Sequence, residues 1–292
     1  MSTQEEAIAS LPLGSLNHEA ADVAYPSTTQ SQLAFRDIID GLKHWPIWLM
    51  LAYQDIKLRY RRSVLGPLWL TLSMAITVYS MGFLYSHLFH IELAHYFPFL
   101  VAGMLGWSLI STVVIETIDG LITSDGFIKQ IKLPYTLYIH RIVTRNVIIF
   151  FHNLLVIVPI YLIFHANVSI NLKTLFVIPG LLIIYFNAIS YGLILGMIGA
   201  RYRDVSQIIK SLVQVVFFIT PVMWSADVLK GVNRYIADAN PFYSFLELIR
   251  APLLGAFPTL LNLSMVTAFS LFGGFVAYKM LVKYRSRIVY WL

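Results

Sequence analysis

The sequence predicts an all-α protein that crosses a membrane several times. Of its 292 residues, 58% are hydrophobic and only 12% are charged, and the mean hydropathy is +0.71. A soluble domain has about 25% charged residues. The apolar stretches reach about 20 residues, the length that crosses a bilayer as a helix, and they lack the polar–apolar alternation of barrel strands. We expect six transmembrane helices, an N-terminal amphipathic interface helix and outer re-entrant helices.

Six stretches carry almost no charge and are the predicted spans. They are residues 67–88, 97–118, 147–164, 175–200, 210–224 and 259–281. The fifth stretch is the shortest and ends near Pro221.

Lys and Arg residues gather in alternate gaps between these spans. One side holds Arg36, Lys43, Lys57, Arg59, Arg61, Arg62, Lys129, Lys132, Arg141, Arg145, Arg201, Arg203, Lys210, Lys279, Lys283, Arg285 and Arg287. The other side holds Lys173, Lys230, Arg234 and Arg250. The positive-inside rule therefore predicts that both termini are cytoplasmic. Anionic headgroups and this rule account for the net charge of +6 without any nucleic acid.

Three regions follow one another along the chain. Residues 1–32 are predicted to be a disordered acidic tail, because they hold several acids among Ser, Thr, Gln and Ala. Residues 33–63 are predicted to be an interface region at the cytoplasmic membrane surface, and residues 64–292 form the membrane domain.

Within the interface region, residues 47–62 are predicted to be a helix after Pro46. Its predicted apolar face holds Leu49, Tyr53, Ile56 and Tyr60, with Gln54, Asp55, Arg61 and Arg62 opposite. Further apolar residues on the polar side give two apolar stripes, one for the bilayer and one for protein.

A helix is also predicted at 241–254, in the gap on the outer side between the fifth and sixth spans. Asn240 and Pro241 form a cap followed by Pro at the first helical position, and Gly255 and Pro258 are stop signals. The segment is too apolar for a free loop, so we expect it to dip partway into the bundle.

Sites for catalysis, cofactors or metals are not predicted on this chain. The sequence has no cysteine and no G-x-x-x-x-G-K-[ST] phosphate loop. Glu116 is the one acid inside a predicted span and lies near its cytoplasmic end. We interpret it as an interfacial carboxylate rather than a proton relay.

Aromatic side chains suggest a path for a glycan, because their faces stack on the C–H groups of sugars. The candidates are Tyr79, Phe83, Tyr85, Trp107, Phe217, Phe218 and Trp224. The alternative interpretation is packing against lipid and interfacial aromatic belts.

Four landmarks together resemble a known family. Arg59-Tyr60-Arg61-Arg62-Ser63-Val64-Leu65-Gly66-Pro67-Leu68-Trp69 precedes the first span, and Arg201-Tyr202-Arg203-Asp204-Val205 precedes the fifth. Phe218-Ile219-Thr220-Pro221-Val222-Met223-Trp224 ends the fifth span, and Asn240-Pro241 through Arg250 follows. From about residue 33 onward the chain is similar to the permease subunit of ABC-2 type exporters of the polysaccharide branch, which export O-antigen, capsule or teichoic acid.

This resemblance implies a channel of two copies in the bacterial inner membrane, energised by two separate ABC ATPase subunits that bind ATP and Mg. The helix at 47–62 would be a gate or interface helix, and the helices around 227–254 would be re-entrant. The loop between the second and third spans would hold the coupling helix, with Asp125, Phe127, Lys129 and Lys132 at the ATPase. The cargo would be a glycan on a polyprenyl diphosphate, with O-antigen of lipopolysaccharide favoured.

A lipid diphosphate needs cations near the cytoplasmic entrance, and Arg59, Arg61 and Arg62 are the candidates. The alternative for this basic run is a topology anchor that snorkels to headgroups.

Two other functions remain open. An ABC-2 exporter of drugs or lipids would need the same ATPase but an apolar path. An ion-coupled secondary transporter would show repeats and buried charges at midplane, which the sequence lacks. A membrane-bound glycosyltransferase would need larger cytoplasmic loops than these.

Overall fold

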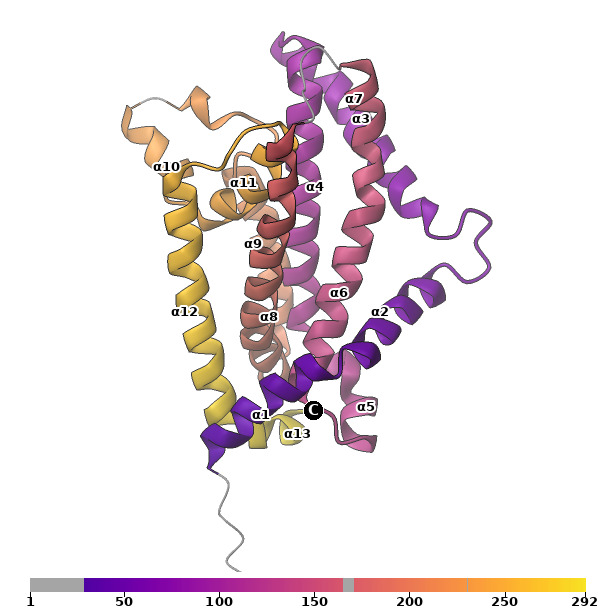
Figure 1. The fold of residues 1–292 in the computed structure, drawn as a ribbon, viewed down its shortest axis with the longest axis vertical. Coiled ribbons are helices and arrows are strands. Elements are labelled where there is room, and N and C mark those ends of the chain that lie inside the picture. Colours follow the sequence, from indigo (N-terminus) through magenta and orange to yellow (C-terminus); the bar gives the residue numbers. More distant parts are fainter. Residues whose placement is uncertain (1–28, 165–170, 230) are drawn as a thin grey trace, which may run out of the picture.

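A computed structural model describes residues 29–164, 171–229 and 231–292, and helices joined by turns and short loops make up that part of the chain (Figure 1). The helices are α1 Gln30–Lys43, α2 Trp45–Arg59, α3 Leu68–Phe89, α4 Leu93–Ile118, α5 Asp125–Gln130, α6 Tyr135–Asn153, α7 Ile157–Ile163, α8 Val177–Arg201, α9 Asp204–Ile219, α10 Arg234–Asp238, α11 Pro241–Leu253, α12 Leu260–Tyr284 and α13 Ile288–Trp291. Short 3₁₀ turns at Ile122–Ser124, Leu154–Val156, Leu172–Phe176, Ala226–Val228, Gly231–Asn233 and Arg285–Arg287 connect them. The described residues contain no strand, so the all-α prediction is confirmed.

Five segments are long and apolar enough to cross a membrane. They are Leu68–Leu88, Leu93–Ile118, Tyr135–Ile163, Leu172–Arg201 and Leu260–Trp291. The predicted fifth span corresponds to α9, whose 16 residues fall short of the usual crossing length of about 20. The chain is therefore a multi-pass membrane protein with at least these five candidate spans.

The predicted third span, 147–164, begins too late. The helical segment starts at Tyr135 instead. Its first half carries Arg141 and Arg145, which lowered its apparent hydropathy, but both guanidinium groups are paired with carboxylates. Pairing reduces the cost of placing these charges near the membrane.

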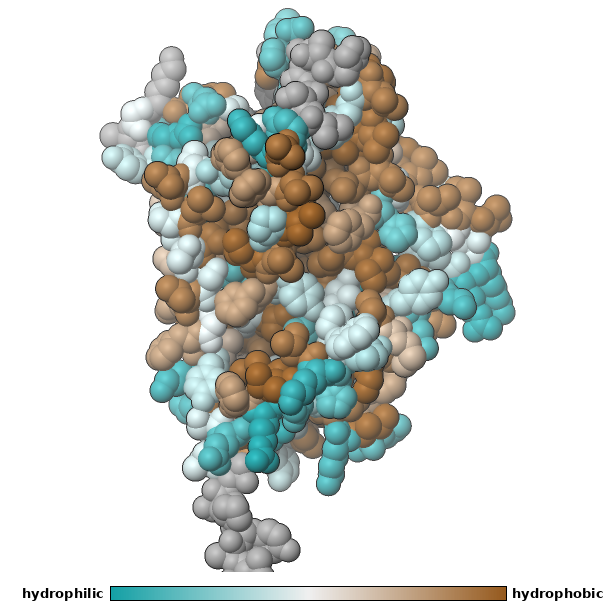
Figure 2. Space-filling view, viewed as in Figure 1, coloured by the Kyte–Doolittle hydropathy of each residue, from teal (hydrophilic) through white to brown (hydrophobic). Residues whose placement is uncertain are grey.

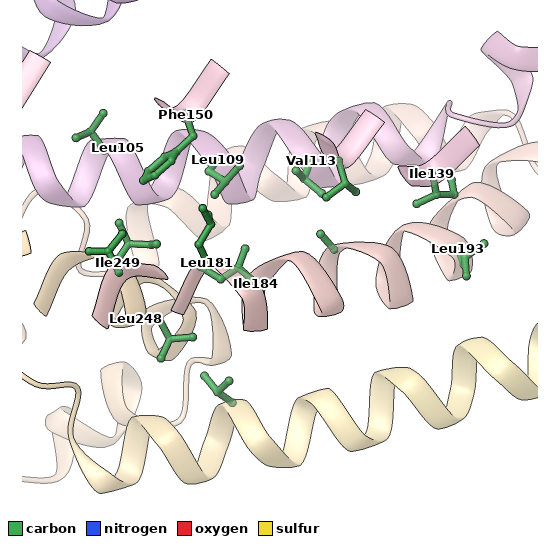
Figure 3. Packing of buried hydrophobic residues seen from close by; sticks show 14 of the residues in the cluster. Leu105, Leu109, Val113, Ile139, Phe150, Leu181, Ile184, Leu193, Leu248 and Ile249 are labelled. Carbon is green, nitrogen blue, oxygen red and sulfur yellow. The ribbon is translucent and has the colours of Figure 1, made fainter. Parts of the chain in front are cut away.

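Helix α4 is the centre of the bundle and packs against α3, α6, α8, α9 and α11. Leu105, Leu109 and Val113 on α4 meet Ile184 of α8 and Ile249 of α11 in the buried core (Figure 3). Leu105, Leu109 and Val113 are four residues apart, so they share one face of α4.

Glycines let α8 approach its neighbours closely. An added Cβ at Gly199 would lie 1.9 Å from the carbonyl oxygen of Ile118, and one at Gly180 would lie 2.5 Å from that of Leu248. Small residues at such contacts allow membrane helices to pack backbone against backbone.

The basic segments gather at one end of the bundle. Figure 1 shows α1, α5 and α13 at this end, together with the C-terminus, while α10 and α11 lie toward the opposite end. Figure 2 shows apolar residues over much of the bundle and hydrophilic residues along the end that carries α1. We call this the basic end.

The predicted tail and interface helix need correction. The tail, 1–32, lies outside the described residues up to residue 28, but its last residues are helical, because Thr29 caps α1 by accepting a hydrogen bond from the backbone N–H of Gln32. The predicted helix at 47–62 runs instead from Trp45 to Arg59, so Arg61 and Arg62 lie in the following turn.

The predicted apolar face of this helix is also wrong in part. Leu49 and Tyr53 are exposed, whereas Ala52 and Ile56 are buried. Asp55, predicted on the polar side, faces the protein because it pairs with two arginines of α6. The exposed Leu49, Met50 and Tyr53 form an apolar stripe that other described parts of the chain leave uncovered.

The helix predicted at 241–254 is present as α11. The Asn240 side chain accepts a hydrogen bond of 2.9 Å from the backbone N–H of Phe242, and Pro241 is the first helical residue. Gly255, just past the end, adopts a φ of 74°, which a glycine reaches without strain.

Candidate functional site

A network of ion pairs joins α2, α4 and α6 near the basic end. Arg141 donates two hydrogen bonds to the Asp55 carboxylate, Nε to Oδ2 at 2.8 Å and Nη2 to Oδ1 at 2.5 Å. Arg145 donates to Asp55 Oδ2 at 2.7 Å and to Glu116 Oε2 at 2.8 Å. One arginine of α6 thus bridges α2 and α4, and we call this set the α2–α6 network.

Helix periodicity explains why these residues meet. Arg141 and Arg145 are four residues apart and lie on one face of α6. Asn146 adds a hydrogen bond of 2.5 Å from Nδ2 to Glu116 Oε2, and Arg59 reaches Glu116 Oε1 at 3.4 Å. Glu116 therefore lies at a helix junction, surrounded by donors.

The electrostatics of Asp55 follow from this arrangement. Burial alone would raise the pKa of its carboxyl, but hydrogen bonds and charges from Arg141 and Arg145 outweigh burial and hold the pKa below its usual value. Asp55 is 13% exposed and its two partners 17% and 14%, so water screens these pairs little.

Helix α5 connects to the same network through an aromatic ring. The guanidinium carbon of Arg141 lies 5.6 Å from the centroid of the Phe127 ring, a distance typical of a cation–π contact. The same Arg141 therefore touches both α5 and α2. Phe127 is 43% exposed, so part of its ring is open to a partner.

Of the other predicted coupling residues, Asp125 and Lys129 lie on α5, and Lys132 lies just after it. Lys129 pairs with Asp125 at 2.9 Å along α5. Lys132 is exposed and follows the end of the helix. Asp125 is the first residue of α5, and Ser124 before it makes no side-chain cap hydrogen bond.

A second junction ties α1 to the start of α6 and to the C-terminal end of α12. The buried Asp37 carboxylate accepts hydrogen bonds from the backbone N–H groups of Thr136, at 3.1 Å, and Tyr135, at 3.2 Å, and from Arg285 Nε at 2.9 Å. An anion at a helix N-terminus is stabilised by the free N–H groups there. Sequence reasoning missed this junction, because its members are about a hundred to 250 residues apart and nothing in their spacing joins them.

The three candidate arginines for a diphosphate lie close together in sequence but differ in environment. Arg59 pairs with Glu116, while Arg61 and Arg62 are exposed in the turn between α2 and α3 and have no ion pair within the described part of the chain. Arg62 has a φ of 72°, the left-handed conformation. Figure 1 shows this turn projecting from the side of the bundle.

The candidate aromatics divide into two groups. Trp107 is buried, with its ring 5.6 Å from Phe217 and 6.2 Å from Phe242, and Trp224 donates from Nε1 to the carbonyl of Phe218 at 3.4 Å.

The second group is on α3. Tyr79 donates to the carbonyl of Val156 at 2.7 Å, Phe83 is exposed, and Tyr85 is half-buried against the core. The structure thus brings Trp107 and Phe217 together but places Tyr79, Phe83 and Tyr85 on a different helix.

A buried arginine anchors α11. Arg250 is 2% exposed; its Nη1 donates to the carbonyl of Pro221 at 2.6 Å, and its Nε donates to Glu247 Oε1 at 2.9 Å. Its guanidinium also lies 4.3 Å from the centroid of the Phe99 ring. The i, i+3 spacing of Glu247 and Arg250 on a helix predicts that the two side chains can pair, but it does not predict that the pair is buried.

No group of three or more His, Cys, Asp or Glu side chains in the described ranges is arranged to hold a metal ion. The α2–α6 network joins three helices, α2, α4 and α6, through ion pairs and hydrogen bonds.

Comparison with known families decides what this arrangement belongs to. The model of the family described as "ABC-2 type transporter" matches residues 47–254, from α2 through α11. This chain belongs to the ABC-2 type transporter family. The matched region contains the α2–α6 network, α5 and the Arg250 anchor.

Individual relatives are more distant. The chain is 21% identical over 202 residues to the O-antigen export system permease protein RfbA of Klebsiella pneumoniae, which covers 68% of this chain and 76% of the relative. It is 21% identical over 205 residues to the protein of the same name from Myxococcus xanthus, covering 70% of this chain and 78% of the relative. These comparisons confirm the resemblance to polysaccharide-export permeases that the four sequence landmarks indicate.

Proposed function

We propose that this chain is the membrane-spanning half of an ATP-driven exporter that moves a lipid-linked polysaccharide, with O-antigen favoured, from the cytoplasm across the bacterial inner membrane. Two copies would form the channel. Two separate ABC ATPase subunits, carrying ATP and Mg, would supply the energy.

The observation that carries the proposal is the contact of one arginine with two elements. Arg141 holds Phe127 of α5 on one side and Asp55 of α2 on the other. An ATPase that pushes on α5 would move Arg141, and Arg141 would move α2. This arrangement suits a chain that has no nucleotide site of its own and receives its energy from outside.

The cargo is inferred from the relatives and from the distribution of charge. Two relatives are named O-antigen export permeases. The exposed Arg61 and Arg62 in the turn that follows α2 supply cations for a diphosphate, and Arg59 at the end of α2 is the third candidate. The aromatic residues of α3 and of the Trp107 group are the proposed lining of the glycan path.

The topology that we propose adds α9 as a sixth span. At about 1.5 Å per residue, its 16 residues reach about 24 Å, enough for a short crossing when Thr220 and Pro221 turn the chain near the outer surface. Helix α11 would then be a re-entrant element on the outer side, and both termini would be cytoplasmic.

Co-purification tests the ATP-driven part of the proposal. The full-length chain, tagged and extracted from its own membranes in mild detergent, should bring down an ABC ATPase, and the eluate should hydrolyse ATP. An eluate without an ATPase would contradict the proposal and favour an ion-coupled secondary transporter.

An ABC-2 exporter of drugs or lipids remains the second candidate, because the family match alone does not distinguish the cargo. It predicts that loss of this chain leaves surface polysaccharide normal and raises sensitivity to apolar compounds.

A further inference from the structure

An apolar cavity of about 420 Å³ lies between α4, α8, α9 and α11. Its size is within the range of sites that bind small molecules, about 300–1,000 Å³. Residues of α4, α8 and α9 form its walls, Phe269 of α12 contributes from the side, and Pro241, Phe242 and Phe245 of α11 close one end. None of these residues belongs to the α2–α6 network.

The polar residues in the wall have their donors occupied within the protein. Thr117 donates to the carbonyl of Val113 at 2.7 Å, Tyr191 to that of Phe269 at 2.9 Å, and Asn187 to the Ser270 hydroxyl at 2.7 Å. The remaining lining residues are mostly aliphatic or aromatic; Figure 3 shows two of them, Val113 on α4 and Ile184 on α8. One acceptor in the wall, Asn187 Oδ1, has no hydrogen-bond partner within the described residues, but the rest of the lining is apolar and favours an apolar occupant.

The position of the cavity limits what can fill it. Its walls are the middle segments and the basic-end halves of membrane helices: Ile110 to Thr117 on α4 and Ile209 to Val216 on α9. The α9 stretch is about 10 Å long at 1.5 Å per residue. An empty space here would leave its lining side chains without contacts on one side, and the surrounding medium offers hydrocarbon chains in excess.

The charges at the basic end indicate which kind of lipid would supply the hydrocarbon chain that fills the cavity. Within the α9 stretch that lines the cavity, Lys210 pairs with Asp119 at 2.7 Å. The exposed Arg203 precedes the first turn of α9 and has no ion pair in the ranges that the structure describes. Cations at this level match the phosphate of a lipid in the leaflet on the basic side.

We propose that the cavity binds one hydrocarbon chain of a membrane phospholipid, inserted from the leaflet at the basic end with its phosphate beside Arg203 and Lys210. Helix α9 then packs against α4 partly through lipid. The proposal rests on the shape and charge of this site and does not depend on which molecule the protein exports.

Photo-labelling tests the proposal directly. The full-length chain is reconstituted in nanodiscs that contain phosphatidylglycerol with a diazirine in the middle of one acyl chain, and the labelled peptides are mapped by mass spectrometry. We expect labelling concentrated on 110–117 of α4 and 209–216 of α9. Labelling that is no denser there than on exposed positions of α3 and α12 would overturn the proposal.

A matched pair of substitutions on α9 sharpens the test. Val213 lines the cavity, whereas Val215 is 53% exposed on the outer face of the same helix. Val213→Phe should fill the space and lower labelling of the cavity peptides about tenfold, while Val215→Phe leaves it unchanged. Equal labelling in both variants contradicts the proposal, and the wild-type map remains decisive if Val213→Phe fails to fold.

Two further outcomes would assign the cavity to another occupant. Labelling abolished by a polyprenyl phosphate but not by excess unlabelled phosphatidylglycerol would assign it to the tail of a polyprenyl lipid. Cross-links between position 213 and a second copy of the chain, in place of lipid labelling, would assign it to a contact between protomers. Either result overturns the proposal.

Discussion

Arg141 donates two hydrogen bonds to the Asp55 carboxylate, and the same guanidinium group lies over the ring of Phe127. Two-point pairing of this kind fixes orientation as well as distance. Helix α2 is therefore positioned by the same side chain that α5 touches.

Replacement of Asp55 should break this link. Asp55→Asn leaves Arg141 and Arg145 without their carboxylate in a largely buried site, which should cost about 2–4 kcal/mol of stability. We expect export to fall about tenfold or more while membrane insertion and binding of the ATPase persist. The measurement is surface polysaccharide in cells together with ATPase co-purification.

Lys57→Gln is the matched control, because Lys57 is exposed on the same helix. A double-mutant cycle of Asp55→Asn with Arg141→Gln should show strong coupling. Additive losses would contradict the role given to the pair.

The pKa of Asp55 predicts a pH dependence. Since its folded pKa lies below the unfolded value of about 3.9, the pair stabilises the protein above that pH, and the contribution is lost as pH falls through the folded pKa. The difference in melting temperature between wild type and Asp55→Asn should be constant from about pH 5 to 8 and shrink below about pH 4. A difference that already shrinks between pH 7 and 5 would rule out Asp55 as its source.

Phe127 is expected to couple ATP hydrolysis to movement of α2. Phe127→Ala removes the ring that faces Arg141, and with it an exposed apolar part of the α5 surface. ATPase activity of the purified complex should persist while export falls about tenfold. Phe127→Trp keeps an aromatic ring and should restore most of the export, whereas equal defects in both variants would argue against the cation–π contact.

The turn between α2 and α3 provides a test of diphosphate recognition. Arg61→Gln with Arg62→Asn removes two exposed cations, and Asn tolerates the left-handed backbone of position 62. Export should fall about tenfold with protein level and ATPase binding unchanged. Normal export in this double variant would assign the basic run to membrane anchoring instead.

Arg250 should matter for stability rather than for coupling. Arg250→Met leaves the Glu247 carboxylate without its cation and removes the hydrogen bond to the carbonyl of Pro221. The free energy of unfolding should fall by about 3–5 kcal/mol, and the melting temperature in detergent should fall with it. Adding Glu247→Leu should recover part of the loss, because the stranded carboxylate is removed. Arg234→Met is the comparison, because Arg234 is also paired but is one-third exposed. An equally large loss of stability in that variant would contradict the importance of burial at Arg250.

Much of the fold was predictable because a bilayer imposes its own dimensions. The apolar stretches and the Asn240-Pro241 start signal located α3, α4, α8, α11 and α12 closely. The start of α6 was missed because hydropathy counts Arg141 and Arg145 as charges and cannot register that Asp55 and Glu116 neutralise them.

The candidate site was predictable only in its local parts. The basic run is visible in the sequence and α5 was implied by the family resemblance, but the partners that connect them lie 29 to 90 residues apart along the chain. The face of α2 was misassigned for the same reason: Asp55 is polar in sequence and turns inward only because α6 presents two guanidinium groups to it. The burial of Arg250 likewise depends on Phe99 and Pro221, which belong to other segments.

The most direct test of the central claim is the fate of the glycan in a strain that lacks this chain. Export of a lipid-linked polysaccharide predicts that surface polysaccharide disappears, that glycan attached to polyprenyl diphosphate accumulates on the cytoplasmic face, and that the wild-type chain restores the surface. Normal surface polysaccharide with no intracellular accumulation would contradict the proposed function.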